Sequence, residues 1–227
     1  LYPLRLIRLL RTLSPLRLQR LQEGRELQEH NHKLGFKKGR LFMRKDFGAK
    51  SWTYPQPVFI VAAYDENGVP NAMNAAWGGI SDDNQLYLCL SKGHKTVKNI
   101  LLTGELTVSM ATKDYVKECD YLGIESGNKT PDKLSRCGLT TVRSSHVNAP
   151  VICELPMCLD CRLISYDGAT GMMLCEIVNV SCDESALTDG KIDPAKLCPI
   201  VFDPVNARYL TLGETVGNAF KDGLKLK

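Results

Sequence analysis

A short segment rich in hydroxyl and basic side chains, SKGHKT at residues 91–96, has the composition of a phosphate-binding loop. It lies between a strand-like run and the start of a helical pattern, where backbone N–H groups are free and the helix dipole favours an anion. A solvated lysine-rich loop with a threonine cap would have the same composition, so these residues alone leave both interpretations open. The candidate phosphate ligands are Ser91, Lys92, His94, Lys95 and Thr96.

The segment NAMNAAWGGI at residues 71–80 carries little side-chain volume and no charge. It fits neither a strand nor a helix well, and it is explained either by a tight turn or by a flat ligand lying against the backbone. One strand separates it from residues 91–96, so in an antiparallel barrel the two segments could form adjacent walls of one cleft. The thin wall offers backbone groups, Asn74 and the Trp77 indole, unless Trp77 is a core anchor behind it. A flat heterocycle that carries a phosphate would suit both walls.

Other motifs point to no catalytic residue and no metal ligand. Cys158 and Cys161 form a C-x-x-C pair, but in a strand pattern the two thiols point to opposite faces, and a zinc site would need a second pair. Spacing does not support a nucleophilic cysteine paired with His94 or His146. The run GETVGNAFKDG has glycines but lacks the strand-then-helix context of a dinucleotide fingerprint. We therefore interpret the cysteines and His146 as structural.

Composition restricts the class of protein and its location. No run approaches the roughly 18 apolar residues of a membrane span. The nine cysteines lie mostly in apolar segments of a chain long enough to fold without disulfides, which predicts reduced thiols and a cytoplasmic protein. Residues 1–42 hold ten basic and three acidic residues, a formal +7, which leaves 19 basic and 22 acidic residues, or −3, for the remainder. The body of the protein is mildly acidic, so we expect no nucleic-acid partner and no membrane partner.

Residues 1–42 differ in character from the rest of the chain. Leucines and arginines alternate, two prolines interrupt the pattern, and no initiator methionine is present. An amphipathic membrane-surface helix, a transit peptide and sequence from outside the natural gene product all compete as explanations. Because Met43 is followed by a plausible native start, RKDFGAKSW, we interpret 1–42 as an extension outside the native fold and 43–227 as one domain.

Strand patterns dominate residues 43–227. Apolar runs with turn signals predict strands at 58–65, at 69 onward into the thin segment, and at 85–91, 106–110, 157–167, 171–185 and 199–203. The turn residues DGATG favour a hairpin between the two long strands 157–167 and 171–185. Helical spacing predicts a helix ending at Gly104, one over 113–123 with Gly123 as terminator, one over 130–138 capped by Thr130, and a short one at 193–197. Short connections and few helices predict an antiparallel barrel or sandwich with helical insertions.

With these segments in order, the chain resembles flavin reductase-like proteins of the flavoredoxin group. The resemblance rests on residues 43–79, LSKGHKTVKNI, DYLGIESGNKTPDK, ELPMCLDCRL, the spacing at 175–185, and PIVFDPVNARYLTLGE. It covers nearly everything from Met43 onward and leaves 1–42 without a counterpart. The resemblance implies a mainly β, FMN-binding split β-barrel of Greek-key type with short helical insertions, which forms a homodimer with FMN near the interface.

The same resemblance implies roles for individual positions. The segment Asn74, Ala75, Ala76 and Trp77 would line the isoalloxazine and ribityl chain, and the loop of Ser91, Lys92, His94, Lys95 and Thr96 would hold the phosphate. Asn218 and Phe220 in the C-terminal tail would reach a flavin across the dimer. The cofactor carries the redox chemistry, so no protein acid or base is required.

Three functions are compatible with this interpretation. The preferred one is an NAD(P)H:flavin oxidoreductase that passes electrons from a reduced nicotinamide through FMN to free flavin or a partner protein. The alternative is a flavoredoxin-type electron carrier between proteins with no nicotinamide site of its own. A flavin-binding protein without turnover is the third.

Overall fold

The computed structural model describes residues 44–227, and the interpretation of residues 1–42 lies outside this part of the chain. The chain divides into Leu1–Lys50 and Ser51–Lys227, and the fold is that of the second unit. Within 44–227, no helix is both long enough and apolar enough to cross a membrane. All nine cysteines lie in this range and are free thiols.

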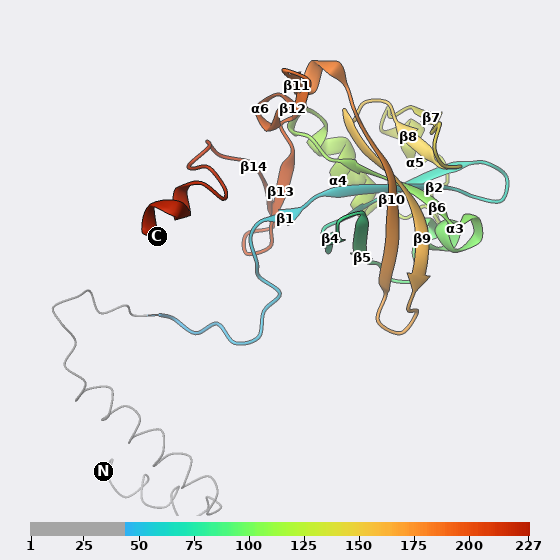
Figure 1. Cartoon of the computed structure of the whole chain (residues 1–227). Coiled ribbons are helices and arrows are strands. Elements are labelled where there is room, and N and C mark those ends of the chain that lie inside the picture. The colour runs from blue at the N-terminus through green and yellow to red at the C-terminus, as the bar shows by residue number, and fades with distance from the viewer. Residues whose placement is uncertain (1–43) are drawn as a thin grey trace, which may run out of the picture. The chain divides into compact units, whose positions relative to one another are not determined.

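A seven-stranded antiparallel sheet, curled into a barrel, forms the body of the protein (Figure 1). Its strand order is β3-β2-β6-β9-β10-β5-β4. The strands are β2 Phe59–Tyr64, β3 Pro70–Ala75, β4 Gly78–Asp82, β5 Gln85–Cys89, β6 Glu105–Met110, β9 Met157–Tyr166 and β10 Met172–Cys182. The predicted antiparallel barrel is confirmed, as is the hairpin of two long strands, β9 and β10.

The two edges of this sheet, β3 and β4, are consecutive in the chain and are joined only by Ala76 and Trp77. Three Cα steps span at most about 11 Å, so the sheet must curl until its edges approach each other here. The two edge strands are nevertheless not neighbours in the hydrogen-bonded order. The barrel is therefore split at the thin segment, in agreement with the expected split-barrel fold.

The thin segment is not an irregular turn, contrary to the expectation that it fits no strand. Residues 71–75 belong to β3 and 78–80 to β4, because strand formation follows from pairing with β2 and β5 rather than from propensity. A Cβ on Gly78 would lie 2.8 Å from Leu88 Cδ2 and 2.8 Å from the Tyr87 carbonyl oxygen. Close approach of β5 thus explains this glycine without any ligand.

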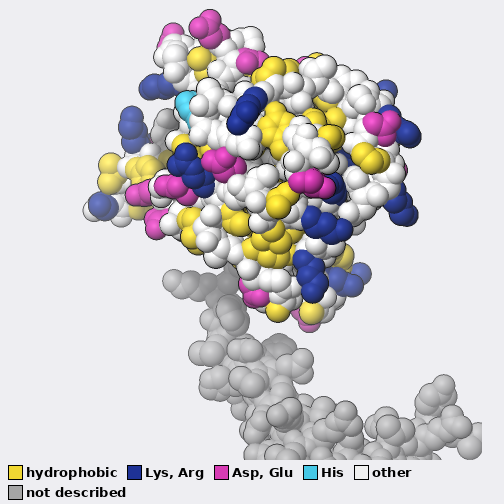
Figure 2. Space-filling view, turned by 90° about the vertical axis from the view of Figure 1, so that its right-hand side faces the viewer, with side chains coloured by type: hydrophobic (Ala, Val, Ile, Leu, Met, Phe, Trp, Pro, Cys, Tyr) yellow, Lys and Arg dark blue, Asp and Glu magenta, His cyan; other side chains and the backbone are white. Residues whose placement is uncertain are grey.

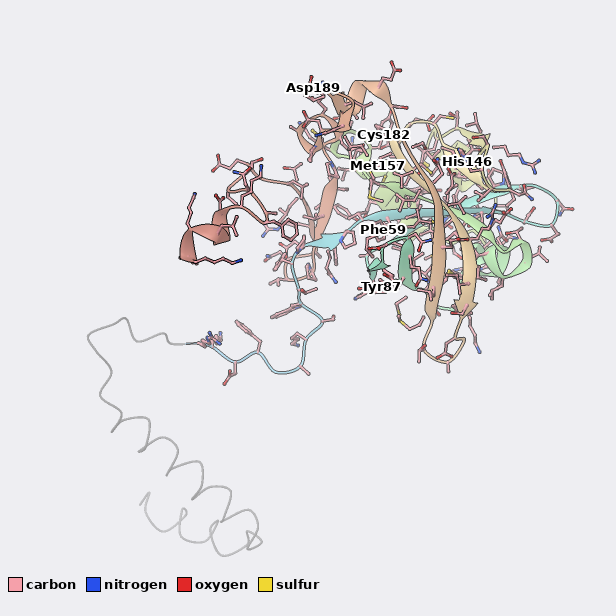
Figure 3. The ribbon with its side chains drawn as sticks, in the orientation of Figure 1. Phe59, Tyr87, His146, Met157, Cys182 and Asp189 are labelled. Atoms are coloured by element: carbon pink, nitrogen blue, oxygen red, sulfur yellow. The ribbon has the colours of Figure 1, made fainter. Side chains whose placement is uncertain are left out.

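The core is divided into two clusters by the sheet, and β2 contributes to both. Phe59, which Figure 3 labels, joins Val61 in the barrel interior, whereas Ile60 and Ala62 face the second cluster. Alternate residues of a strand point to opposite faces, so a strand buried on both faces reads as a continuous apolar run.

Two helices pack on the strands next to the split. Helix α3, Lys95–Thr103, packs on β2 and ends at Gly104, as predicted, and this glycine has a left-handed φ of 71°. Helix α4, Val116–Ile124, follows the 3₁₀ turn η1, Lys113–Tyr115, and packs on β3. The predicted terminator Gly123 lies inside α4, where an added Cβ would sit 3.1 Å from Asn74 Cβ, so this glycine serves packing rather than termination.

The remaining elements are short. Helix α5, Lys133–Arg136, begins later than predicted, with Asp132 at its N-cap, because the Thr130 hydroxyl donates to Glu125 instead. Helix α6, Pro194–Leu197, and strand β13, Ile200–Asp203, are confirmed. The pattern did not predict β1 Gln56–Pro57, β7 Thr141–Arg143, β8 Pro150–Ile152, β11 Leu187–Thr188, β12 Lys191–Ile192, β14 Arg208–Thr211, or the turns η2 Glu184–Ala186 and η3 Asp222–Leu226. Most of these are too short to show a period.

The C-x-x-C cysteines lie in β9 and are both buried. Cys161 packs in the barrel interior, whereas Cys158 pairs in register with Ser109 on β6. Burial raises the pKa of the Cys158 thiol to about 11 and also raises the pKa of Cys161. Both thiols are therefore protonated at neutral pH, and neither has the low pKa of a reactive cysteine.

Candidate functional site

A pocket of about 770 Å³ lies where the barrel is split. The end of β3, the β3–β4 connection and the segment from β5 into α3 form one side of it. The C-terminal end of α4 with the loop after it, and the turn between β9 and β10, form the rest. The structure places every predicted ligand-binding residue in its lining: Asn74, Ala75, Ala76, Trp77, Ser91, Lys92, His94, Lys95 and Thr96.

The thin wall consists of Ala75, Ala76 and Trp77. The Trp77 side chain is 55% exposed, so it borders the pocket and is not a core anchor. The Cys89 N–H donates to the Trp77 carbonyl oxygen over 2.8 Å, which holds this connection against β5. The two alanines and the fixed backbone give a wall on which a planar group can lie, with the Trp77 side chain at its border.

The basic loop is only partly free to meet a ligand. Lys95 Nζ lies 3.5 Å from the Asp65 carboxylate and 3.9 Å from that of Glu66. Lys92 is exposed and has no ion pair with any of the described residues 44–227. The loop therefore offers one free ammonium, and Lys95 contributes charge that two carboxylates partly balance.

Thr96 and His94 line the pocket, but the Thr96 hydroxyl already has a protein partner and the His94 side chain is uncharged. Thr96 is 1% exposed, and its hydroxyl donates to Asn71 Oδ1 over 2.8 Å. His94 is the N-cap of α3, but its side chain makes no capping bond. Burial and the charge of Lys133 lower the His94 pKa below its usual value. At neutral pH the imidazole is uncharged, so it can contribute a hydrogen bond more readily than a charge.

The loop after α4 faces the basic loop, and two side chains tie the walls together. Asn128 Nδ2 donates to the Gly93 carbonyl oxygen over 3.0 Å, while Lys98 Nζ donates to Asn128 Oδ1 over 2.9 Å. Gly127 packs on Asn71 so closely that an added Cβ would lie 2.2 Å from Asn71 Nδ2. Gly127, Asn71 and Thr96 thus form one continuous contact within the lining of the pocket.

Lys133 lines the pocket from α5 and is only 2% exposed. Its Nζ donates to two carbonyl oxygens, those of Leu122 at 3.0 Å and Glu125 at 2.9 Å. Burial lowers the Lys133 pKa to about 8. Lys133 is not among the residues predicted from the sequence, where its place in the segment DYLGIESGNKTPDK was the signal for it.

The turn between β9 and β10 covers the end of β5. The Leu90 N–H donates to the Gly171 carbonyl oxygen over 2.8 Å, and the Tyr166 hydroxyl donates to the Leu90 carbonyl oxygen over 2.8 Å. Gly171 has a φ of 78°, and a Cβ there would lie 2.9 Å from the Leu90 carbonyl oxygen. The turn residues DGATG predict this turn but not its place at the pocket, because only the curl of the sheet brings it there.

Three other residues considered from the sequence do not line the pocket of this chain. His146 belongs to the loop between β7 and β8, and Figure 3 shows it beside that hairpin. Asn218 and Phe220 lie in the C-terminal tail, where Phe220 is 98% exposed. A role for the tail toward a second subunit stays a prediction.

Charges of both signs are interspersed on the face shown in Figure 2, with apolar side chains between them. The features that suggest a ligand therefore lie in the residues that line the pocket and not in the overall charge of that face. It places a thin backbone wall at one end and ammonium groups and helix-start N–H groups at the other. This arrangement suits a planar heterocycle that carries a phosphate, and it provides no obvious acid–base pair.

Comparison with known proteins agrees with this geometry. The family model "Flavin reductase like domain" matches residues 51–205. The solved flavoredoxin of Desulfovibrio vulgaris (Miyazaki F) is 38% identical, with 80% of this chain and 100% of that chain covered and a TM-score of 0.77. Flavoredoxin from Methanosarcina acetivorans is 26% identical, with 83% and 100% covered and a TM-score of 0.72.

Two further comparisons give one more solved structure and one curated protein with lower similarity to this chain. An FMN-binding domain of a flavin reductases-like enzyme from Shewanella baltica is 21% identical, with 72% of this chain and 89% of that chain covered and a TM-score of 0.65. Among curated proteins, an uncharacterized protein of Aquifex aeolicus is 26% identical over 119 residues, which are 49% of this chain and 60% of that protein. The match to that relative thus spans less than two thirds of its length.

We predict that Gly127→Ala destabilises the protein by about 1–3 kcal/mol, because the new methyl group displaces Asn71 and breaks its bond to Thr96. Urea unfolding followed by tryptophan fluorescence measures the change. Gly93→Ala is the matched control, since its Cβ would meet nothing within 4 Å. Equal stability of the two variants would show that the close contact between Gly127 and Asn71 is unimportant.

Proposed function

This chain belongs to the flavin reductase-like family of FMN-binding split-barrel proteins, flavoredoxin group, and from that premise we propose that it binds FMN and transfers electrons through it. A flavin cofactor follows from the family. The choice of FMN is supported by a pocket whose basic end suits a single phosphate, and by the FMN-binding domain among the structural neighbours.

The main support for this proposal is that two segments, Asn74–Trp77 and Ser91–Thr96, line the same pocket. Each was predicted from its residue types to contact one part of a flat ligand that carries a phosphate. The isoalloxazine would lie along Ala75, Ala76 and Trp77. The ribityl chain would pass Asn74, whose side-chain amide is held by the Cys119 carbonyl oxygen at 3.0 Å. The phosphate would meet the loop from Ser91 to Thr96.

Bound FMN supplies the redox chemistry, and the chain holds and orients it. Backbone groups suit this task, because their positions do not change with a side-chain rotamer. Trp77 and Cys89, both exposed, border the ring end of the pocket. A flavin ring there would be within reach of a second planar molecule or of a partner protein.

We favour an NAD(P)H:flavin oxidoreductase that passes electrons from a reduced nicotinamide through FMN to free flavin or to a partner. The family description supports this choice. A flavoredoxin-type carrier between proteins is the alternative, and the 38% identity to flavoredoxin of Desulfovibrio vulgaris over 80% of this chain supports it.

We expect the purified protein to take up FMN, to show the yellow flavin spectrum, and to bleach when NADH or NADPH is added without oxygen. Stopped-flow absorbance measures the rate, and free FMN without protein is the control. Bleaching only with dithionite or a reduced partner protein would overturn the reductase in favour of the carrier. A protein that remains colourless with excess FMN would refute the flavin site itself.

For the phosphate loop, we predict that Lys95→Ala combined with Thr96→Ala weakens FMN binding at least tenfold. A charge-assisted hydrogen bond contributes about 1.5–3 kcal/mol, and the change also removes the bond from Thr96 to Asn71. Quenching of flavin fluorescence gives the dissociation constant. Lys117→Ala, at an exposed position of α4, is the control. An unchanged FMN affinity in the double variant would exclude the loop from the site.

We also propose a homodimer. Ile80 on the edge strand β4 is 64% exposed, Tyr87 on β5 37% and Met172 on β10 44%, so neighbouring strands present apolar side chains. Val216 and Phe220 in the tail are more than 90% exposed and would be covered by a second copy. Sedimentation equilibrium should give twice the chain mass of 25.2 kDa. A single-chain mass at micromolar concentration would contradict the proposal.

A further inference from the structure

Tyr209 on β14 does not line the pocket, but its hydroxyl bonds to α4, the helix whose C-terminal end does. The hydroxyl donates to Asp120 Oδ1 over 2.7 Å. The ring packs in the second core cluster beside Phe202, with the two ring centroids 6.1 Å apart. Strand β14 lies beyond residues 51–205, which the family model matches. The bond to Asp120 therefore joins a segment outside the matched region to a helix at the pocket.

Asn74 in the pocket wall is held by the same helix. Its Nδ2 donates to the Cys119 carbonyl oxygen over 3.0 Å. Gly123 packs on this side chain so closely that an added Cβ would lie 3.1 Å from Asn74 Cβ and 3.6 Å from Asn74 Cγ. Asn74 also acts on Tyr209, because burial and Asp120 raise the pKa of the Tyr209 hydroxyl whereas hydrogen bonding by the Asn74 side chain lowers it. The Asn74 amide thus has both α4 and Tyr209 as neighbours.

The donors and acceptors of this group determine which end of the Asn74 amide is free. Carboxylate and carbonyl oxygens can only accept, so Tyr209 gives its proton to Asp120, and Asn74 turns Nδ2 rather than Oδ1 toward Cys119. With its proton committed, the Tyr209 oxygen can only accept, so it also favours Nδ2. Asn74 Oδ1 accepts no hydrogen bond from any residue in the range 44–227. This oxygen is the polar group that Asn74 leaves for a ligand.

We propose that Tyr209 is a positioning residue, which keeps Nδ2 of Asn74 turned toward α4 and leaves Oδ1 to accept a hydrogen bond from a hydroxyl group of the ligand. The chemical class of ligand is a planar ring that carries a polyol chain. The inference rests on the proposed function, in which a ribityl chain passes Asn74. Because the amide is already fixed before the ligand arrives, binding does not have to order it.

A double-mutant cycle tests this role, with FMN affinity measured by quenching of flavin fluorescence. Tyr209→Phe removes the hydroxyl and keeps the ring, and we expect it to weaken FMN binding about fivefold, which is the range of one neutral hydrogen bond. In the Asn74→Ala background the same change should cause no further loss, because the side chain through which Tyr209 acts is absent.

Lumiflavin provides a readout that a merely structural role would not separate. It has the flavin ring with a methyl group in place of the ribityl chain, so Tyr209→Phe should leave its affinity nearly unchanged. Tyr115→Phe is the matched control, since Tyr115 is another partly buried tyrosine at the second cluster and its hydroxyl has no hydrogen bond within residues 44–227.

The possible results separate this inference from the proposed function. Equal losses of FMN and lumiflavin affinity in Tyr209→Phe, no loss of either, or additive losses in the double variant would overturn the role of Tyr209 and leave the FMN site standing. If Tyr209→Phe does not fold, Asp120→Ala replaces it, because the freed Tyr209 proton can then compete for Asn74 Oδ1, and the same selective loss of FMN affinity is expected. A wild-type protein that binds no FMN would overturn the proposed function and this inference together.

Discussion

The two-residue connection between β3 and β4 is the constraint on which the rest of this structure depends. It joins the two edges of a seven-stranded sheet, so the sheet has to curl until both edges lie at one place. Because the edges do not pair there, the barrel stays open at that point, and α3 and α4 pack beside the opening. The pocket is thus a consequence of how the sheet closes, with Ala76 and Trp77 as part of its wall.

Close contacts between backbone and side chains keep this opening in shape. Gly127 allows the loop after α4 to press on Asn71, and Asn71 in turn accepts the Thr96 hydroxyl. Asn128 then joins that loop to the start of α3 through Gly93. Hydrogen bonds that involve no carboxylate therefore hold the loop after α4 against Asn71 and the start of α3.

The three lysines that line the pocket differ in how far carboxylates or water offset their positive charge. Lys95 is balanced by Asp65 and Glu66, Lys92 is exposed, and Lys133 is buried without a carboxylate partner in the described part of the chain. A buried cation interacts more strongly with an anion than an exposed one, because water screens it less.

Local sequence determined the long strands, α3 with its glycine stop, the β9–β10 hairpin, and the chemical type of both pocket walls. These features depend on side-chain period, turn residues and donor groups that neighbours in the chain supply. Only the tertiary structure decided that residues 71–75 and 78–80 belong to two strands, that Gly123 lies within a helix, and that Lys133 reaches the pocket. Pairing partners, close packing and burial produce these features, and each depends on residues distant in sequence whose approach no local pattern encodes.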